Sequence, residues 1–249
     1  MSYVIPRAIA LIACMLATVS AIGADLPDHA KVQEALRAIV KEKNGGFGLN
    51  MWATLVDRDG VVRVVVFTGK DRGDQWPGSR VISAQKANTA NAFSLPTLAV
   101  STAQLFSAVQ PGGSLFGLQE SNPVDPAVAY GGKSEDNGTP KDGMIGKKIG
   151  GVNVFGGGLA LYAADGTLLG GIGLSGDSSV ADHIIAWKLR HALALDTIPG
   201  GVSPTGDDNM AIDITDGKSA SGWGHAATTD EATAIVKDLP KTAPVVKKK

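Results

Sequence analysis

Three side chains on one predicted helix have the types and spacing to bind a metal-containing aromatic ligand. His183, Trp187 and His191 follow one another every four residues, so they share one side of a helix and drift slowly around it. An imidazole can ligate heme iron, and an indole beside it can stack on a flat ring. His183 is therefore the candidate metal ligand, with Trp187 as a wall of its pocket. The alternative is a helix face packed on a sheet, with His183 as a satisfied core residue.

Two further polar side chains are candidates for the same ligand. His225 ends the run GWGH at residues 222–225, and a histidine on a glycine-rich loop can reach over a pocket. The alternative for this loop is a surface segment anchored by Trp223. Lys86 lies on another predicted helix and could bind an anionic group such as a propionate. The alternative for Lys86 is an ordinary solvated helix face.

Recognised catalytic motifs are missing from the sequence, which contains no Gly-x-Ser-x-Gly, His-Glu-x-x-His or P-loop pattern. The glycines at 170–176 lead into a helix, but Asp177 would repel an anion there, so we expect a helix cap. The acid-rich stretches 71–74 and 207–216 lack EF-hand spacing and are interpreted as turns. The sequence thus favours a binding protein over an enzyme, without deciding the question.

Composition is that of an ordinary globular protein. The chain has 249 residues, of which 44% are hydrophobic and 19% charged, with a formal net charge of −1. Such a chain can bury a sizeable core, and nothing in this charge balance suggests a nucleic-acid partner.

The first 24 residues have the pattern of a secretory signal peptide. Arg7 is their only charged side chain, and an apolar run over 8–19 is followed by small residues. That run is too short for a comfortable membrane span, although an uncleaved anchor is the alternative. We therefore expect a periplasmic or secreted protein with no stable membrane span after cleavage. Cys14, the only cysteine, would be removed with the signal, leaving no disulfide.

The rest of the chain alternates hairpins and helices. Helical periodicity predicts helices over 29–43, 80–93 and 101–109. Strand-like runs at 49–56 and 61–67 are joined by DRDG, a hairpin turn, and runs at 152–162 and 167–174 form a second hairpin. Three glycines at 156–158 interrupt the third strand, which suggests a bulge or a close approach. A last helix begins at Asp177 or Ser178 and ends near residue 195.

These elements predict one α+β domain over 25–199, an antiparallel sheet with helices covering one face. A long irregular loop over 110–150, rich in Gly, Pro, Ser, Asp and Asn, is inserted in it, and such loops are often functional. Residues 200–249 form a loop-rich C-terminal extension.

Four short motifs resemble those of the GlcG/HbpS-like (DUF336-type) family and follow one another along the chain in the family's order. Its G-x-[IL]-G-[VL]-S-G signature is similar to GGIGLSG at 170–176, and its glycine-rich hairpin to GGLALY at 157–162, where Ala160 replaces the usual proline. Its second-helix motif is similar to KANTA at 86–90, and its D-x-x-G turn to DRDG at 57–60.

The resemblance implies a profilin-like antiparallel sheet flanked by helices, a homo-oligomer, and heme or a related tetrapyrrole as ligand. It also adds Thr89, beside Lys86 in the second-helix motif, to the candidate ligand-binding residues. Two other functions stay open. One is an enzyme or accessory factor acting on a small organic acid or metabolite, with Ser175, Asp177 and His183 at its site. The other is a structural homo-oligomer.

One subgroup of the family implies a cysteine at the position of Val180 and another shortly after His225, and neither is present. We therefore expect packing and hydrogen bonds alone to hold the C-terminal extension.

Overall fold

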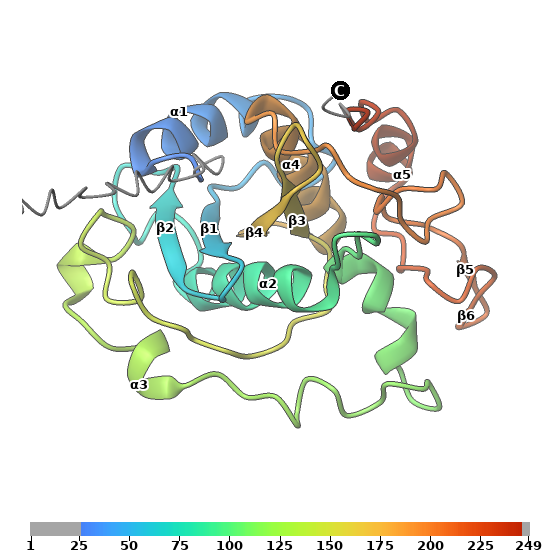
Figure 1. Cartoon of the computed structure of the whole chain (residues 1–249), viewed down its shortest axis with the longest axis horizontal. Helices are drawn as coiled ribbons and strands as arrows, with labels where there is room; N and C mark the ends of the chain where they lie inside the picture. The colour runs from blue at the N-terminus through green and yellow to red at the C-terminus, as the bar shows by residue number, and fades with distance from the viewer. Residues whose placement is uncertain (1–25, 246–249) are drawn as a thin grey trace, which may run out of the picture.

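A four-stranded antiparallel sheet forms the centre of the computed structural model, which describes residues 26–245 (Figure 1). The strands are β1 (Trp52–Asp57), β2 (Val62–Phe67), β3 (Gly158–Tyr162) and β4 (Leu168–Ser175), in the order β2-β1-β4-β3. Both predicted hairpins are present. In the first turn Gly60 has a φ of 76°, a conformation that glycine adopts without strain.

Helices cover both faces of the sheet, so the expectation of one covered face is wrong. α1 (His29–Ile39) and α4 (Ser179–Ala192) pack on one face, and α2 (Ser79–Phe93) packs on the other. The first five residues of β1 are all buried, because alternate side chains point to opposite covered faces. A continuous apolar run, rather than an apolar–polar alternation, is the sequence signal of such a strand. The α+β class and the flanked antiparallel sheet are confirmed.

Glycines in β4 let α2 lie unusually close to the sheet. A Cβ atom at Gly173 would lie 2.0 Å from the carbonyl oxygen of Ser83, and one at Gly171 would lie 2.3 Å from that of Ala87. Carbon and oxygen atoms do not approach to these distances, so a side chain at either position would push the helix off the strand.

Several predicted boundaries shift. α1 ends at Ile39 rather than at residue 43, and the segment 101–109 forms two 3₁₀ turns, η1 (Thr102–Leu105) and η2 (Ser107–Val109). The glycines at 156–158 precede or open β3 instead of interrupting a longer strand. A Cβ atom at Gly156 would meet the carbonyl oxygen of Ser179 at 2.4 Å. Of the two predicted alternatives, a bulge or a close approach, the structure shows a close approach, and the neighbour is α4.

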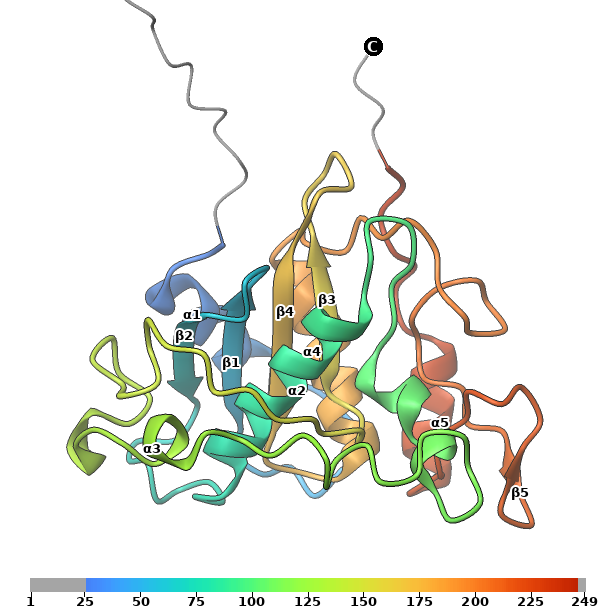
Figure 2. The ribbon, with the colours of Figure 1, turned by 60° about the horizontal axis from the view of Figure 1, so that its bottom comes forward.

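The inserted segment 110–150 is largely irregular, as expected, with only two short helical turns, α3 (Pro126–Ala129) and η3 (Ser134–Asp136). It passes α2 on the side away from the sheet (Figure 2). Arg80 of α2 anchors it, pairing with Asp142 at 2.8 and 2.5 Å and donating to the carbonyl oxygen of Ala129. The insert is thus fixed to the domain by a buried ion pair.

The C-terminal part holds more regular structure than the sequence indicated. It contains β5 (Ile214–Thr215), β6 (Lys218–Ser219) and α5 (Asp230–Lys237). α5 is capped by Thr229 and packs on α4. A buried, hydrogen-bonded ion pair between Arg190 and Asp208 fastens the extension to α4 at 2.6 and 2.8 Å. The expectation named packing and hydrogen bonds alone, so this ion pair is an addition to it.

The predicted signal peptide and the basic tail at 247–249 lie outside the described residues. Among residues 26–245, no helix combines the length and the apolar content needed to cross a bilayer.

Replacing Gly173 by alanine tests the close packing of α2 on β4. We expect Gly173→Ala to lower the free energy of unfolding by about 2–3 kcal/mol, the usual cost of forcing extra volume into a packed core. Gly78→Ala is the matched control, because a Cβ there has open space, and we expect it to cost less than about 1 kcal/mol. Chemical denaturation measures both, and equal losses would contradict the packing argument.

Candidate functional site

Lys86 reaches the start of α4 through the core. Its ammonium donates to the carboxylate of Asp182 at 2.7 Å and to the carbonyl oxygen of Leu174 at 2.9 Å, and the residue is 1% exposed. Burial raises the pKa of Asp182 to about 6, against the opposing effect of Lys86, so this carboxyl is mostly ionised at neutral pH. The solvated helix face considered for Lys86 is wrong, and in this arrangement its charge is already paired.

His183 is enclosed in the core. Its Nε2 lies 3.2 Å from both the Asn209 side-chain oxygen and the Met210 backbone nitrogen, and its Nδ1 has no partner. Its exposure is 0%, and burial lowers its pKa to about 3, so the ring is neutral. This arrangement matches the core-histidine alternative more closely than an open ligand position.

Trp187 lies next to His183, with 6.0 Å between the ring centroids. Its indole donates to the carbonyl oxygen of Pro240 at 2.8 Å, and its ring borders a cavity of about 440 Å³ that Asn209, Lys237 and Lys241 also line. Trp187 thus borders a cavity, but His183 does not line that cavity. Trp187 is only 2% exposed, and the extension closes over it.

His225 ties the C-terminal extension to α4 rather than reaching over a pocket. Its Nδ1 lies 2.7 Å from the carbonyl oxygen of Ala226, and its Nε2 lies 2.8 Å from the hydroxyl of Ser179. Since a carbonyl only accepts, Nδ1 carries the proton and Nε2 accepts from the serine. Burial lowers the pKa of His225 to about 4.

Thr89 is buried on α2, one turn from the Lys86 pair. Its hydroxyl donates to the carbonyl oxygen of Gln85 and accepts from the backbone nitrogen of Asn153. Both hydrogen-bonding roles are therefore taken. The candidates His183, Trp187 and His225 do come together around α4. Of the five predicted site residues, however, only Trp187 lines any of the cavities found among the described residues.

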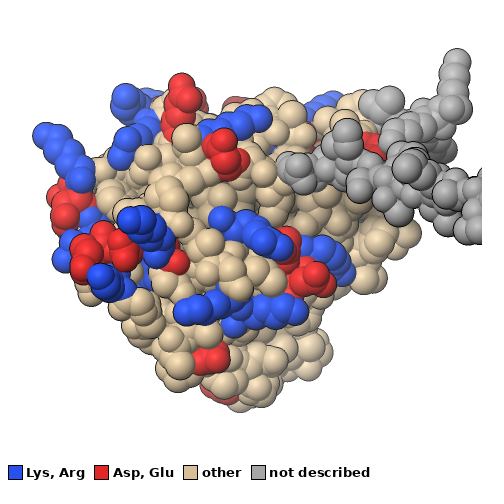
Figure 3. Space-filling model, turned by 60° about the vertical axis from the view of Figure 1, so that its left-hand side comes forward, with Lys and Arg blue, Asp and Glu red and all other residues tan. Residues whose placement is uncertain are grey.

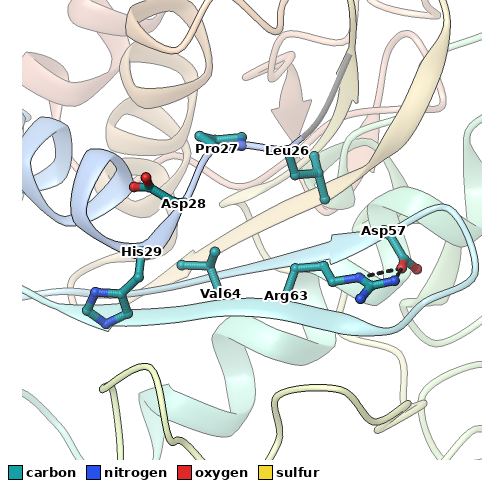
Figure 4. A pocket seen from close by; sticks show the side chains of 7 residues that line it. All are labelled: Leu26, Pro27, Asp28, His29, Asp57, Arg63 and Val64. Carbon is teal, nitrogen blue, oxygen red and sulfur yellow. Dashed lines mark hydrogen bonds and ion pairs between the residues drawn. The ribbon is translucent and has the colours of Figure 1, made fainter. Parts of the chain in front are cut away.

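A larger cavity, of about 590 Å³, lies between the start of α1 and the first hairpin (Figure 4). Seven residues line it: Leu26, Pro27, Asp28, His29, Asp57, Arg63 and Val64. Its volume is in the range of small-molecule sites. In the sequence, His29 stands out only as the first residue of a predicted helix. The one feature that could have marked it as a site residue is its position directly after an apolar pair and the helix-capping Asp28.

His29 has a defined tautomer at this cavity. Its Nε2 lies 2.9 Å from the carbonyl oxygen of Gly138 in the insert, so Nε2 must carry the proton when the ring is neutral. Nδ1 then holds the free lone pair, and it has no hydrogen-bond partner among residues 26–245. Metal-binding histidines commonly donate their other ring N–H to a carbonyl in this way.

Arg63 and Asp57 lie at the end of the cavity away from His29, whereas the third charged residue, Asp28, lies beside His29 (Figure 4). Arg63 pairs with Asp57 through two contacts of 2.5 and 2.6 Å, and the Arg63 side chain is 54% exposed. On the face of the molecule shown in Figure 3, positive and negative side chains are interspersed. Individual groups rather than a broad field of one sign would therefore orient a ligand there.

The acid-rich stretch 71–74 forms a turn, as predicted, whereas 207–216 also contains the short strand β5. Asp74 accepts hydrogen bonds from the backbone nitrogens of Asp71 and Lys70, which lower its pKa. Asp207 accepts from Ser203 and Thr205. Residues 26–245 contain no group of three or more His, Asp or Glu side chains placed to hold a metal ion.

Solved structures with a similar arrangement are distant. A PduOC:heme complex is 26% identical, with a TM-score of 0.45, and covers 66% of this chain and 89% of its own. The ORFY protein of Klebsiella pneumoniae, assigned to DUF336, is 22% identical (TM-score 0.43; 70% and 97% covered). A double mutant of Streptomyces reticuli HbpS is 18% identical (TM-score 0.42; 75% and 99% covered).

No curated protein sequence matches the chain. A family model described as "Haem degrading protein HbpS-like" matches residues 25–190. This match spans the sheet, its covering helices and the insert. The chain therefore belongs to the HbpS-like family.

Proposed function

We propose that this protein binds heme or a related tetrapyrrole, and that the cavity bordered by His29 holds it. The observation that carries the proposal is the His29 imidazole, which lines the largest described cavity. Its Nε2–H is held by the carbonyl oxygen of Gly138, and its Nδ1 has no hydrogen-bond partner among residues 26–245. Membership of the HbpS-like family supports the choice of ligand.

The residues around the cavity fit such a ligand. Leu26, Pro27 and Val64 offer apolar surface for a macrocycle, and Arg63 offers a cation for a propionate. The Arg63–Asp57 pair is largely exposed on the arginine side, and exposed ion pairs contribute little stability, so a propionate can compete for the guanidinium. Heme would supply an iron centre to which the imidazole of His29 can bind.

His183 was the predicted axial ligand, and it stays the competing position. Reaching it would require the segment containing Asn209 and Met210 to leave α4, because both residues cover the ring. Asp208, the neighbour of Asn209 in the chain, pairs with Arg190 of α4 and so holds that segment in place. Separating one partner of a buried ion pair costs about 3–5 kcal/mol of folding free energy. Access to His29 needs no such rearrangement.

The other functions considered, an enzyme for a small organic acid and a structural oligomer, predict no saturable heme spectrum. Export to the periplasm or outside the cell, and self-association, remain our predictions. The N-terminal residue of the native protein, determined by mass spectrometry, tests the first. Light scattering at micromolar concentration tests the second.

A hemin titration of histidine variants tests the binding proposal. We expect the wild-type protein to give a Soret shift that saturates at a simple stoichiometry, because a coordinating imidazole changes the iron's electronic environment. His29→Ala should alter the position of the bound Soret band and weaken binding. His191→Ala is the control, since His191 is half exposed and pairs with Asp196, and it should bind hemin like the wild type.

A third variant, His183→Ala, separates the two histidine positions. If His29 is the ligand, His183→Ala lowers thermal stability and leaves the heme spectrum unchanged. A changed spectrum in His183→Ala, with a normal one in His29→Ala, would contradict the His29 assignment while preserving heme binding. A wild-type protein with no saturable shift would overturn the proposed function itself.

The buried state of His183 predicts a pH-dependent stability. Burial lowers the pKa of folded His183 to about 3, below the ordinary histidine value of 6.5. The unfolded chain therefore binds the extra proton as the pH falls below 6.5, and stability is lost in that direction. We expect His183→Gln to reduce this loss by up to about 1.4 kcal/mol per pH unit between pH 6 and 4. Urea denaturation across this range measures it. Parallel stability curves for the two proteins would show that His183 is not held neutral in the folded state.

A further inference from the structure

A second pocket lies where the inserted segment meets the start of α2, and it shares no lining residue with the cavity assigned to heme. It has a volume of about 330 Å³, and its walls are formed by Trp52, Asp71, Arg72, Gly73, Pro77, Arg80, Ser134 and Asn137. Ser134 and Asn137 come from the insert, and the other six come from the domain. The pocket therefore exists only because the insert is docked on the domain.

The insert is held firmly enough to form a pocket wall. Asp142 pairs with Arg80 and also accepts from the backbone nitrogen of Gly138 at 2.7 Å. Gly138 lies against two aromatic rings, because a Cβ there would be 2.3 Å from Phe67 and 2.9 Å from Trp52, and its φ of 75° suits glycine. The wall is thus fixed by a buried ion pair and by close backbone packing.

The two arginines of this pocket differ in their availability. Arg80 is buried, and its charge is matched by Asp142 at 2.5 Å, with side-chain exposures of 6% and 0%. Arg72 is 45% exposed, and its ion-pair partner Asp71 is 3.7 Å away and 68% exposed. A pair this long and this exposed contributes little, so Arg72 can exchange Asp71 for the anionic group of a ligand.

The remaining walls combine apolar surface with hydrogen-bonding groups. Trp52 backs the pocket as a buried residue, 1% exposed, and its ring is fixed by its hydrogen bond to the carbonyl oxygen of Trp76 and by an edge contact with Phe67. Pro77 adds apolar surface, and Ser134 and Asn137 add hydrogen-bonding groups. Apolar walls with a few convergent polar groups are the usual composition of a small-molecule site.

We infer that this pocket binds a small carboxylate, with Arg72 receiving the carboxylate and Pro77 contacting the apolar part of the ligand. The site is separate from the proposed heme cavity, and it depends on the inserted segment. Its occupant is set by one available guanidinium and by a volume too small for a macrocycle of heme size.

Benzoate is the probe for this site, with benzamide as the uncharged comparison. Ligand-observed NMR titration of the full chain should show saturable benzoate binding and much weaker benzamide binding. Arg72→Gln should weaken benzoate about tenfold, the effect of losing one charge-assisted hydrogen bond of roughly 1.4 kcal/mol. Arg72 is half exposed, so we expect this variant to fold normally.

Two further variants keep the test specific. Lys70→Gln removes a positive charge from the same loop without altering the pocket, and it should bind benzoate like the wild type. Ser134→Trp should abolish binding by filling the mouth from the insert side. Absence of saturable benzoate binding, an unchanged affinity in Arg72→Gln, or an equal loss in Lys70→Gln would each overturn the inference. None of these results depends on hemin, so the outcome is independent of the proposed heme site.

Discussion

The close contact between α2 and β4 is the constraint on which the other features depend. Gly171 and Gly173 leave room for the helix backbone to lie directly on the strand. Only at that separation does the ammonium of Lys86 reach Leu174 at the end of β4 and Asp182 at the start of α4. A buried ion pair is weak evidence for stability, but removing one partner is costly. We interpret the Lys86–Asp182 pair as fixing the position of α4 relative to α2 at the end of β4.

The two additions to this domain use the same two helices as platforms. The insert is fastened to Arg80 of α2, and the C-terminal extension to Arg190 of α4. Their consequences for ligands are opposite. The extension closes over α4 and hides His183, whereas the insert borders one pocket and contacts His29 at another. Gly138 of the insert sets the tautomer of His29, and its neighbours Ser134 and Asn137 wall the second pocket.

The sequence was sufficient to predict the hairpins, the main helices and the family, because those signals are local. The residues DRDG favour a tight turn, and the glycines of GGIGLSG favour a strand on which a helix can pack closely, and both preferences can be read from the residues themselves. The positions of Lys86 and His183 were not predictable in the same way. Both lie on helices, but partners far away in the sequence decide their burial: Asp182 for Lys86, and Asn209 for His183. His29 was missed because its cavity is formed with Arg63 and Val64 of another element, and its partner Gly138 lies in an irregular segment with no periodic signal.

The position of the iron in a crystal of the hemin complex tests the central claim most directly. An iron anomalous-difference map locates the metal independently of any assumed coordination. Our account predicts one peak beside His29 Nδ1, in the cavity between the start of α1 and the first hairpin, with Asn209 still covering His183. A peak beside His183, with the segment around Asn209 displaced from α4, would contradict it.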